Sequence, residues 1–569
     1  MRPSIRSIGT TPLMMAGVLV VLIVLFRTLV SGWGPPAAAA TEGVTRYGLA
    51  GYPADNLSYV SWAAQAREGR WLFEILYTTS PHGRFFFNPL FLAIGGIASF
   101  LDTSPLLVLN VLAIFSLPIV VLCFWHLCRS MQLSTGAGIA ATCLALGGAG
   151  FSWVRWGVDK AGLGNVLPVG PLGPDQSFYD VYPIVAYFLA PYHAIALAIV
   201  AALMATVVAL DDPEHPITKG RLALLAALAV LLATVRPHIA IMFCLAYGAA
   251  VTGTILWRAS MDLIHRRLVV LVSLAVTIVP PVLYSLWISQ QPIWMEYARA
   301  HPAVTDDWAV GFFLLWILAG AGLSVLGSRT LHSRYAFPAA WAVVAATLLL
   351  GLNGFIYPKL TYGVTLAMAL LAGAAVDRVL ASVRSRAVMA AVVAGVSAVA
   401  LASPILQLQD FTPRSAPRTS VELFQAAETI RRVRTAPVPT VLADCGTGVL
   451  LPGLAGVRVF CGHWALTDHN REKIVLLSRL GFLADGAAVP TFPDLDERQI
   501  AADSVRLRDQ VRSGTFDYVV VRAQQRVYGP LISAGSGCTL QKGEDYAVLS
   551  TCPAVRAKLD EILSSAEME

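Results

Sequence analysis

Charged residues are scarce in this sequence of 569 residues. They make up 13% of the chain, and 56% of its residues are hydrophobic. A typical soluble domain carries about 25% charged residues. The apolar residues fall in runs of roughly 18–25, the length that a helix needs to cross about 30 Å of hydrocarbon. The composition therefore predicts an α-helical polytopic membrane protein.

The signatures of many soluble enzymes are also missing. The sequence has no P-loop GxxxxGK(S/T), no HExxH, no GxSxG and no glycine fingerprint that opens a strand–helix unit. An ATP-driven pump or a cytosolic-type nucleotide-sugar enzyme thus finds no support. The apolar runs lack charges at their centres, which transport paths usually carry. Basic loops account for the net charge of +6, so no nucleic-acid partner is implied.

The apolar runs predict about eleven spanning helices. They are expected near 13–31, 105–128, 134–152, 183–210, 222–235, 239–257, 268–288, 309–326, 335–352, 364–382 and 387–403. Segment 86–101 is apolar but short and contains Asn88-Pro89, which predicts a re-entrant or interfacial helix.

The loop charges predict the topology. If 86–101 does not cross, the short basic loops all lie on one side, which the positive-inside rule makes cytoplasmic. The predicted location is the cell membrane (inner or plasma membrane). The N-terminus is then cytoplasmic and the tail is extracytoplasmic. We expect the first span to be retained, with a signal peptide as the alternative. The predicted domains are a transmembrane domain, 1–406, with the outer loop 32–85, and an extracytoplasmic domain, 407–569.

The tail has a different composition, with short strand patterns alternating with helix patterns. TVLADC, VRVFCG and FDYVVVR indicate strands, and GCTLQKGEDYAVLSTC indicates a closing hairpin. Such alternation predicts a small α/β domain. Four of the eight cysteines lie here, and we favour the pairs Cys445–Cys461 and Cys538–Cys552. A zinc site is the competing interpretation, although no pair has the close spacing that structural zinc prefers.

Asp55 is the sharpest candidate for chemistry. It precedes a helix pattern in the first outer loop, where Ser58, Ser61, Gln65 and Glu68 recur on one side and aromatic and small residues on the other. This spacing predicts an amphipathic helix along the membrane surface that ends near Gly69. Asp55 is then a helix N-cap, a catalytic carboxylate, or both.

Other polar residues collect at the same predicted depth. Arg155 lies in the long outer loop 153–182 with Asp175 and Asp180; Tyr192 and His193 interrupt one helix near its outer end; Arg236 and His238 enter another; Lys359 precedes a late span. The histidines are either packed caps or binding groups. The cations either extend to the interface or hold a lipid phosphate. The two loop acids are either solvated or face Asp55.

Several short segments together resemble the GT-C glycosyltransferases, and specifically a bacterial branch of that superfamily. YPADNLSYVSWAAQAREGRW is similar to the first outer loop of these enzymes, and FNPLFLAIGGIA to the segment that follows it. LAPYHAIALAI, PKLTYGVTLAMALLAG and the tail segment LLPGLAGVRVFCGHWALTDHNREK look like further parts of the same branch. GT-C enzymes are polytopic and use polyprenyl-phosphate-linked sugars at the outer face of the membrane.

The resemblance implies a function and a site. Asp55 would be the general base that takes the proton of the acceptor hydroxyl. Substrate would be bound by Asn56, Arg155, Tyr192, His193, Arg236, His238 and Lys359. The family's paired acidic motif is reduced to Asp55-Asn56, so no metal ligands are assigned and a divalent cation is optional. The acceptor would be a glycan, a lipid or a protein. The rival hypothesis is a non-catalytic lipid-linked glycan transporter or a membrane scaffold with an extracytoplasmic binding domain.

Overall fold

In this computed structural model the chain forms two compact units. It describes residues 14–15, 17, 44–46, 53–148, 158, 160–161, 184, 191–214, 216–257, 259–295, 313–327, 334–351, 363–410, 418–463, 466–482, 490, 492 and 495–566. The membrane unit comprises Met1–Val30, Leu109–Trp287 and Pro302–Ser415. The loop–tail unit comprises Ser31–Val108, Ile288–His301 and Ala416–Glu569, so segments of the outer loop and the tail fold together.

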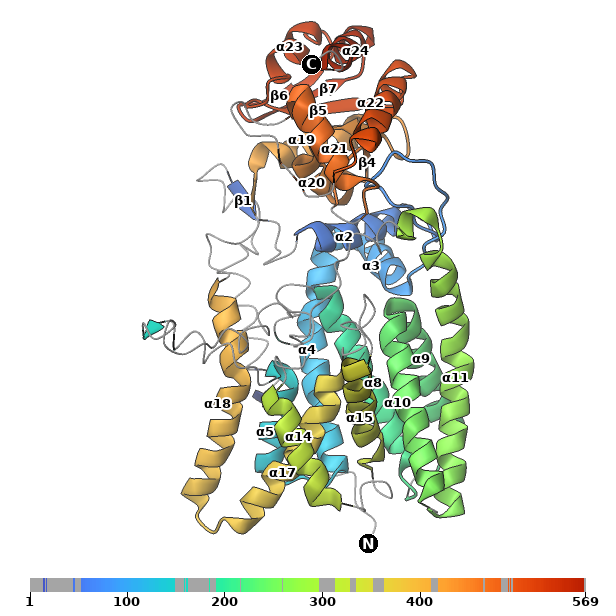
Figure 1. The fold of residues 1–569 in the computed structure, drawn as a ribbon, viewed down its shortest axis with the longest axis vertical. Helices are drawn as coiled ribbons and strands as arrows, with labels where there is room; N and C mark the ends of the chain where they lie inside the picture. The colour runs from blue at the N-terminus through green and yellow to red at the C-terminus, as the bar shows by residue number, and fades with distance from the viewer. Residues whose placement is uncertain are drawn as a thin grey trace. The chain divides into compact units, whose positions relative to one another are not determined.

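Long apolar helices build the membrane unit (Figure 1). They are α4 (Pro105–Ser130), α5 (Thr135–Gly147), α8 (Pro191–Asp211), α9 (Lys219–Val235), α10 (Pro237–Leu256), α11 (Met261–Ser289), α14 (Phe313–Leu326), α15 (Ala336–Gly351), α17 (Val364–Ser382) and α18 (Arg386–Asp410). Each coincides with a predicted span; the first predicted span, 13–31, lies almost wholly outside the described residues. Five of the described helices, α4, α8, α10, α11 and α17, have the length and hydropathy of a full crossing. The chain is a multi-pass membrane protein, and the count of eleven stays a prediction.

Small residues let these helices approach closely. A Cβ on Gly322 of α14 would lie 1.9 Å from the Leu371 carbonyl oxygen of α17. A Cβ on Gly147 of α5 would lie 2.2 Å from the Ala400 carbonyl oxygen of α18. Inside lipid the hydrophobic effect does not drive helices together. Close packing at small residues and the dispersion attraction that it allows hold them together instead.

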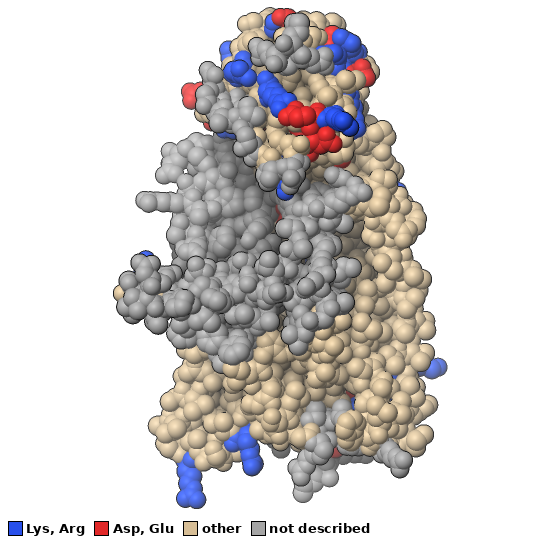
Figure 2. Space-filling model, viewed as in Figure 1, with Lys and Arg blue, Asp and Glu red and all other residues tan. Residues whose placement is uncertain are grey.

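Polar contacts tie several interhelical connections together at one end of the membrane unit. Arg334 lies 2.9 Å from the Asp212 carboxylate and 2.5 Å from the Ser130 carbonyl oxygen. Nearby, Arg267 lies 3.2 Å from Asp211, the last residue of α8. Figure 2 shows the described surface of these helices with little charge apart from basic side chains at the lower end. The structure therefore gathers several of the predicted basic loops on one side of the helices.

The tail is the predicted α/β domain. Its sheet has the order β4-β3-β5-β7-β6, with β3 parallel to β4 and β5 and the remaining pairs antiparallel. The strands are β3 (Thr440–Leu442), β4 (Arg458–Val459), β5 (Tyr518–Arg522), β6 (Thr539–Lys542) and β7 (Tyr546–Ser550), and the helices are α19 (Val421–Val433), α20 (Cys445–Ala455), α21 (Asn470–Leu477), α22 (Glu497–Arg512), α23 (Tyr528–Ala534) and α24 (Pro553–Ala566). A π-helical turn, η5 (Ser478–Phe482), follows α21. The strands β3, β4 and β5 and the hairpin β6–β7 lie where the sequence patterns predict them.

Both favoured disulfides are present. Cys445 is bonded to Cys461, and Cys538 to Cys552. The zinc interpretation of these four cysteines is therefore wrong, because each sulfur is already bonded to another. The first bond joins the start of α20 to the chain just after β4, and the second closes the β6–β7 hairpin at its open end.

The outer loop contains α2 (Pro53–Arg67), which packs against α20 of the tail, and α3 (Pro89–Phe100), which packs against α2. A short strand, β1 (Val44–Arg46), also pairs antiparallel with β2 (Arg418–Ser420). The carbonyl of Asn88's side chain caps α3 by accepting from the Leu90 N–H at 3.0 Å. Helix α3 is about 18 Å long, shorter than the hydrocarbon layer, which fits the expected non-crossing segment.

Helix α2 forms as predicted, but its polar side does not face water. Ser58, Ser61 and Gln65 are all buried, because the segment after α2 folds back over them. Gln65 accepts from the Glu74 N–H and donates to the Glu74 carbonyl, both at 3.0 Å. The predicted polar side of α2 is therefore largely covered by protein, and of its four polar residues only Glu68 is exposed. The position of α2 along the membrane surface stays a prediction.

Candidate functional site

Asp55 lies in the first turn of α2, which begins at Pro53. The N-cap interpretation is therefore wrong, since Asp55 is already inside the helix. An acidic side chain in this turn is favoured by the positive end of the helix dipole. Its Oδ1 lies 3.0 Å from Nε2 of His463, and its side chain is 30% exposed whereas that of His463 is 2% exposed. The carboxylate is thus accessible and its partner is buried.

The protonation of His463 follows from its second contact. The backbone N–H of Leu466 points at Nδ1, with a nitrogen–nitrogen distance of 3.2 Å. A backbone N–H can only donate, so Nδ1 accepts and the neutral ring carries its proton on Nε2. Nε2 then donates to Asp55. The ring of Tyr77 meets the imidazole edge to face, with 5.4 Å between ring centroids.

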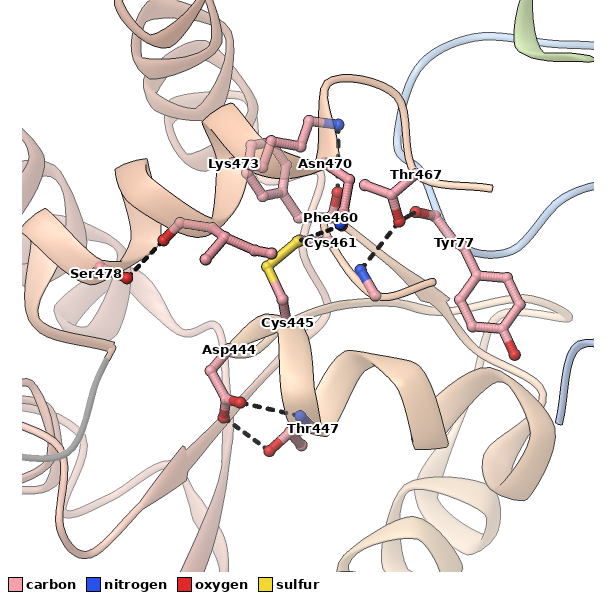
Figure 3. The surroundings of a disulfide bond; sticks show 12 residues. Tyr77, Asp444, Cys445, Thr447, Phe460, Cys461, Thr467, Asn470, Lys473 and Ser478 are labelled. Carbon is pink, nitrogen blue, oxygen red and sulfur yellow. Dashed lines mark hydrogen bonds between the residues drawn. A yellow bond between two sulfur atoms is a disulfide. The ribbon is translucent and has the colours of Figure 1, made fainter. Parts of the chain in front are cut away.

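The loop that carries His463 is tied to the segment after α2. Thr467 donates to the Tyr77 carbonyl oxygen at 2.8 Å and accepts from the Gly462 N–H at 3.0 Å (Figure 3). The Val459 N–H of β4 donates to the Leu76 carbonyl oxygen at 2.8 Å. Two segments almost 400 residues apart in the sequence therefore hold each other beside the Cys445–Cys461 disulfide, which Figure 3 shows between them and α20.

Tyr77 is fully enclosed beside this pair. Burial raises its pKa well above the ordinary value, and the negative charge of Asp55 raises it further, while Ser61 acts in the opposite direction. The phenol therefore stays neutral at physiological pH and forms an uncharged wall of the site.

A second buried cluster lies on the same loop, centred on Asp468. Its Oδ1 lies 2.6 Å from Nζ of Lys473 and accepts from Thr78, and its Oδ2 accepts from Ser80 at 2.5 Å and lies 3.1 Å from Arg506. Burial raises the pKa of Asp468, but Lys473 and these hydrogen bonds outweigh it and hold the pKa below its usual range. The carboxylate is ionised and anchors the segment 78–80.

A third cluster holds the turn after α2. Glu74 is buried, and its carboxylate lies 2.7 Å from Arg458 and 3.2 Å from Arg70. Next to it, Glu68 lies 2.7 Å from Arg434. Each carboxylate comes from the outer loop, and Arg458 and Arg434 come from the tail. These pairs fix the part of the outer loop that presents Asp55.

Sequence reasoning missed His463, Tyr77 and Asp468. The sequence does carry a signal for His463 and Asp468, because both lie in the tail segment that resembles the GT-C branch. That stretch places two histidines and an acid, GHWALTDH, directly after a disulfide cysteine. Nothing in the sequence, however, says that this loop meets Asp55 rather than another part of the chain.

The predicted residues of the membrane unit fall at neighbouring helix ends. Tyr192, in the first turn of α8, donates its hydroxyl to the Val235 carbonyl oxygen at 2.6 Å. The Arg236 guanidinium lies over the Tyr192 ring, 4.7 Å from its centroid. His193 follows Tyr192 with 6.0 Å between ring centroids, and His238 is the second residue of α10. The structure therefore groups Tyr192, His193 and Arg236. His238 follows two residues after Arg236.

The remaining predicted residues are placed differently. Asn56 is fully buried, and Arg155 and Lys359 lie outside the described residues. Asp175 and Asp180 lie outside them as well. Within the described ranges no three His, Cys, Asp or Glu side chains converge in a way that could hold a metal ion.

Solved structures of three membrane proteins are similar to this chain. ArnT from Cupriavidus metallidurans, bound to undecaprenyl phosphate, has a TM-score of 0.50 at 12% identity, over 96% of this chain and 98% of ArnT. An oligosaccharyltransferase from Archaeoglobus fulgidus has a TM-score of 0.48 at 13% identity, over 89% of this chain and 69% of its own. The arabinofuranosyltransferase AftD from mycobacteria has a TM-score of 0.47 at 14% identity, over 90% of this chain and 35% of AftD. No protein-family model and no curated protein matches the sequence. The chain therefore shares its fold with ArnT, as the resemblance predicted.

Proposed function

We propose that the chain is an integral membrane glycosyltransferase that moves one sugar from a polyprenyl-phosphate donor to a glycan, lipid or protein acceptor. The observation that carries this proposal is the placing of Asp55. The outer loop presents the partly exposed carboxylate of Asp55 in the first turn of α2, beside the buried ring of His463. The likeness to ArnT extends over nearly the whole of both chains, and the ArnT structure holds undecaprenyl phosphate, a lipid of the proposed donor class.

The reaction is a displacement at the anomeric carbon of the sugar. The acceptor oxygen forms a bond to C1 as the bond from C1 to the phosphate oxygen breaks, and the product lipid is a polyprenyl phosphate. Asp55 takes the proton of the acceptor hydroxyl, which must come within about 3 Å of its carboxylate. A single displacement inverts the configuration at C1. The sugar is a hexosyl or pentosyl residue.

The leaving phosphate needs cations at the depth of the lipid headgroups, because its negative charge grows as the bond breaks. We assign this role to Arg236, with Lys359 and Arg155 as further candidates. The stacking of Arg236 on Tyr192 supports the choice, since a guanidinium held against a ring keeps its donors in a fixed plane. We assign His193 and His238 to the binding of the donor, and Asn56 of the loop–tail unit to the binding of substrate. Phosphate is a good leaving group, so a divalent cation is optional.

The proposed site faces the extracytoplasmic side of the cell membrane. The gathering of basic loops at one end of the membrane unit supports this topology, because such loops stay in the cytoplasm. The disulfides support it too, since they form and persist in oxidising compartments.

The test is transfer by the purified full-length protein. A panel of radiolabelled polyprenyl-phosphate sugars is incubated with glycan, lipid and peptide acceptors, beside an Asp55→Ala variant. We expect one donor class to be consumed by the wild type only, with both disulfides and the elution volume of the variant unchanged. Full activity of Asp55→Ala would refute the role of this carboxylate. Wild-type protein that binds donors but consumes none would support the lipid-linked glycan transporter instead.

A further inference from the structure

We infer that His463 is a positioning residue: the tail domain supplies the hydrogen bond that orients the Asp55 carboxylate for proton transfer. The inference rests on the proposed function and adds to it a residue 408 positions further along the chain. It gives the tail a direct part in the reaction, beyond binding or folding.

The direction of the hydrogen bond is determined by the contacts. The Leu466 N–H donates to Nδ1 of His463, so the proton of the neutral ring lies on Nε2. Nε2 is 3.0 Å from Oδ1 of Asp55. An imidazole that donates to a carboxylate through one nitrogen, while the backbone holds the other, fixes the plane of that carboxylate. His463 itself is 2% exposed, so it acts through Asp55 and not on the substrate.

The loop that carries His463 is rigid enough for this role. Cys461, two residues earlier, is bonded to Cys445 of α20. A Cβ on Gly448 of α20 would lie 1.9 Å from the Cys461 carbonyl oxygen, and one on Gly462 would lie 2.6 Å from the Gly448 carbonyl oxygen. The two backbones therefore touch directly and have no room to shift. Positioning groups must be held within about 0.5 Å of the productive geometry, and this packing provides such a support.

Helix α20 also reaches the helix that carries Asp55. A Cβ on Gly453 of α20 would lie 2.9 Å from the Leu57 carbonyl oxygen of α2. One short helix thus packs against both partners of the hydrogen bond, His463 through its loop and Asp55 through α2. The distance between Nε2 and Oδ1 is consequently set by the backbone packing of α20.

The experiment compares three substitutions of His463 in the full chain. His463→Asn places an amide near Nδ1, so it keeps an acceptor for Leu466 but cannot reach Asp55. His463→Gln places an amide near Nε2 and restores a donor to Asp55. His463→Phe keeps a ring against Tyr77 without any donor. Thermal unfolding and both disulfides are checked for each variant.

We expect the Asn and Phe variants to lose roughly ten- to hundred-fold in kcat, with the donor KM within about two-fold of the wild type. The loss stays below the contribution of a general base itself, which is about 10²–10⁴-fold. The Gln variant should recover at least about ten-fold over Asn, because only Gln restores the hydrogen bond. Equal kcat in the Asn and Gln variants would overturn the inference, whether both are active or both inactive.

A second readout does not depend on turnover. A water-soluble carbodiimide labels accessible carboxylates, and the labelled fraction of Asp55 is measured by mass spectrometry. We expect Asp55 to react several-fold faster in His463→Asn than in the wild type, and at the wild-type rate in His463→Gln. Equal rates in all three proteins would overturn the inference. A wild-type protein that transfers no sugar would overturn the proposed function, while this labelling would still report on the hydrogen bond.

Discussion

The buried ion pair between Lys473 and Asp468 offers the sharpest test of how the tail holds the outer loop. Lys473 is fully buried, and its Nζ lies 2.6 Å from Asp468 Oδ1. Burial lowers the pKa of Lys473, and Asp468 opposes that shift. Lys473→Met keeps the apolar stem and removes the charge. The carboxylate then stays buried with Thr78, Ser80 and Arg506 as partners.

The expected cost follows from burial. Removing one partner of a buried ion pair destabilises the folded state by about 3–5 kcal/mol. Arg506 still partners the carboxylate, so we take the lower end, about 3 kcal/mol. Since each 1.4 kcal/mol is about tenfold in an equilibrium constant, the population in which the segment is released should rise on the order of 100-fold.

Hydrogen–deuterium exchange of the full-length protein measures that population. The amide of Phe73 is bonded to the Phe86 carbonyl, and that of Glu74 to Gln65. Exchange in the peptide covering 73–80 should therefore quicken on the order of 100-fold in Lys473→Met. Peptides of α17 and α18 should not change.

A matched control separates burial from charge. Lys558 lies 2.6 Å from Glu561, the same distance, but this pair is partly exposed. Exposed pairs contribute about 0.2–1 kcal/mol, so Lys558→Met should alter exchange near its own site by less than about fivefold. Equal small effects of the two substitutions would refute the reasoning. Adding Asp468→Asn to Lys473→Met should recover part of the loss, because the buried carboxylate charge that lost Lys473 is then removed.

Three further outcomes are expected. Gly448→Ala should lower the unfolding temperature by the equivalent of about 1–3 kcal/mol or more, because the new Cβ meets Cys461 at 1.9 Å; Gly529→Ala, where nothing lies within 4 Å, should not. The lowered pKa of Asp468 means that its contribution is complete above its unfolded pKa, about 4, and is lost as pH falls through the lower folded value. Exchange in 73–80, corrected for the intrinsic rate, should thus rise progressively as the pH falls below about 4 in the wild type, and an Asp468→Asn variant should show no such rise. Arg236→Ala should lower kcat/KM for the donor at least about tenfold, with part of the loss in kcat, because one charge-assisted hydrogen bond is worth about 1.5–3 kcal/mol and the phosphate charge grows as the bond breaks; an unchanged kcat/KM would remove Arg236 from the phosphate site.

Much of the fold could be predicted from the sequence because its signals are local. Apolar runs of membrane-spanning length mark the helices, and α4 to α18 follow them closely. Strand patterns of a few residues mark β3, β4 and β5, and a cysteine at each end of the β6–β7 hairpin marks its disulfide. Asp55 stood out because it is an acid at the start of a helix, and that helix exists.

Tertiary structure alone decided what surrounds Asp55. His463, Thr467 and Asp468 reach the outer loop from the far end of the chain, and local periodicity carries no information about which distant loop a helix will meet. The same holds for Ser58 and Gln65. Their spacing shows that one side of α2 is polar, which the sequence can determine. Whether that side meets water or protein depends on how the chain packs around it. Here Glu74 of the segment after α2 bonds to Gln65, and Ser58 donates to the Asp55 carbonyl oxygen of its own helix.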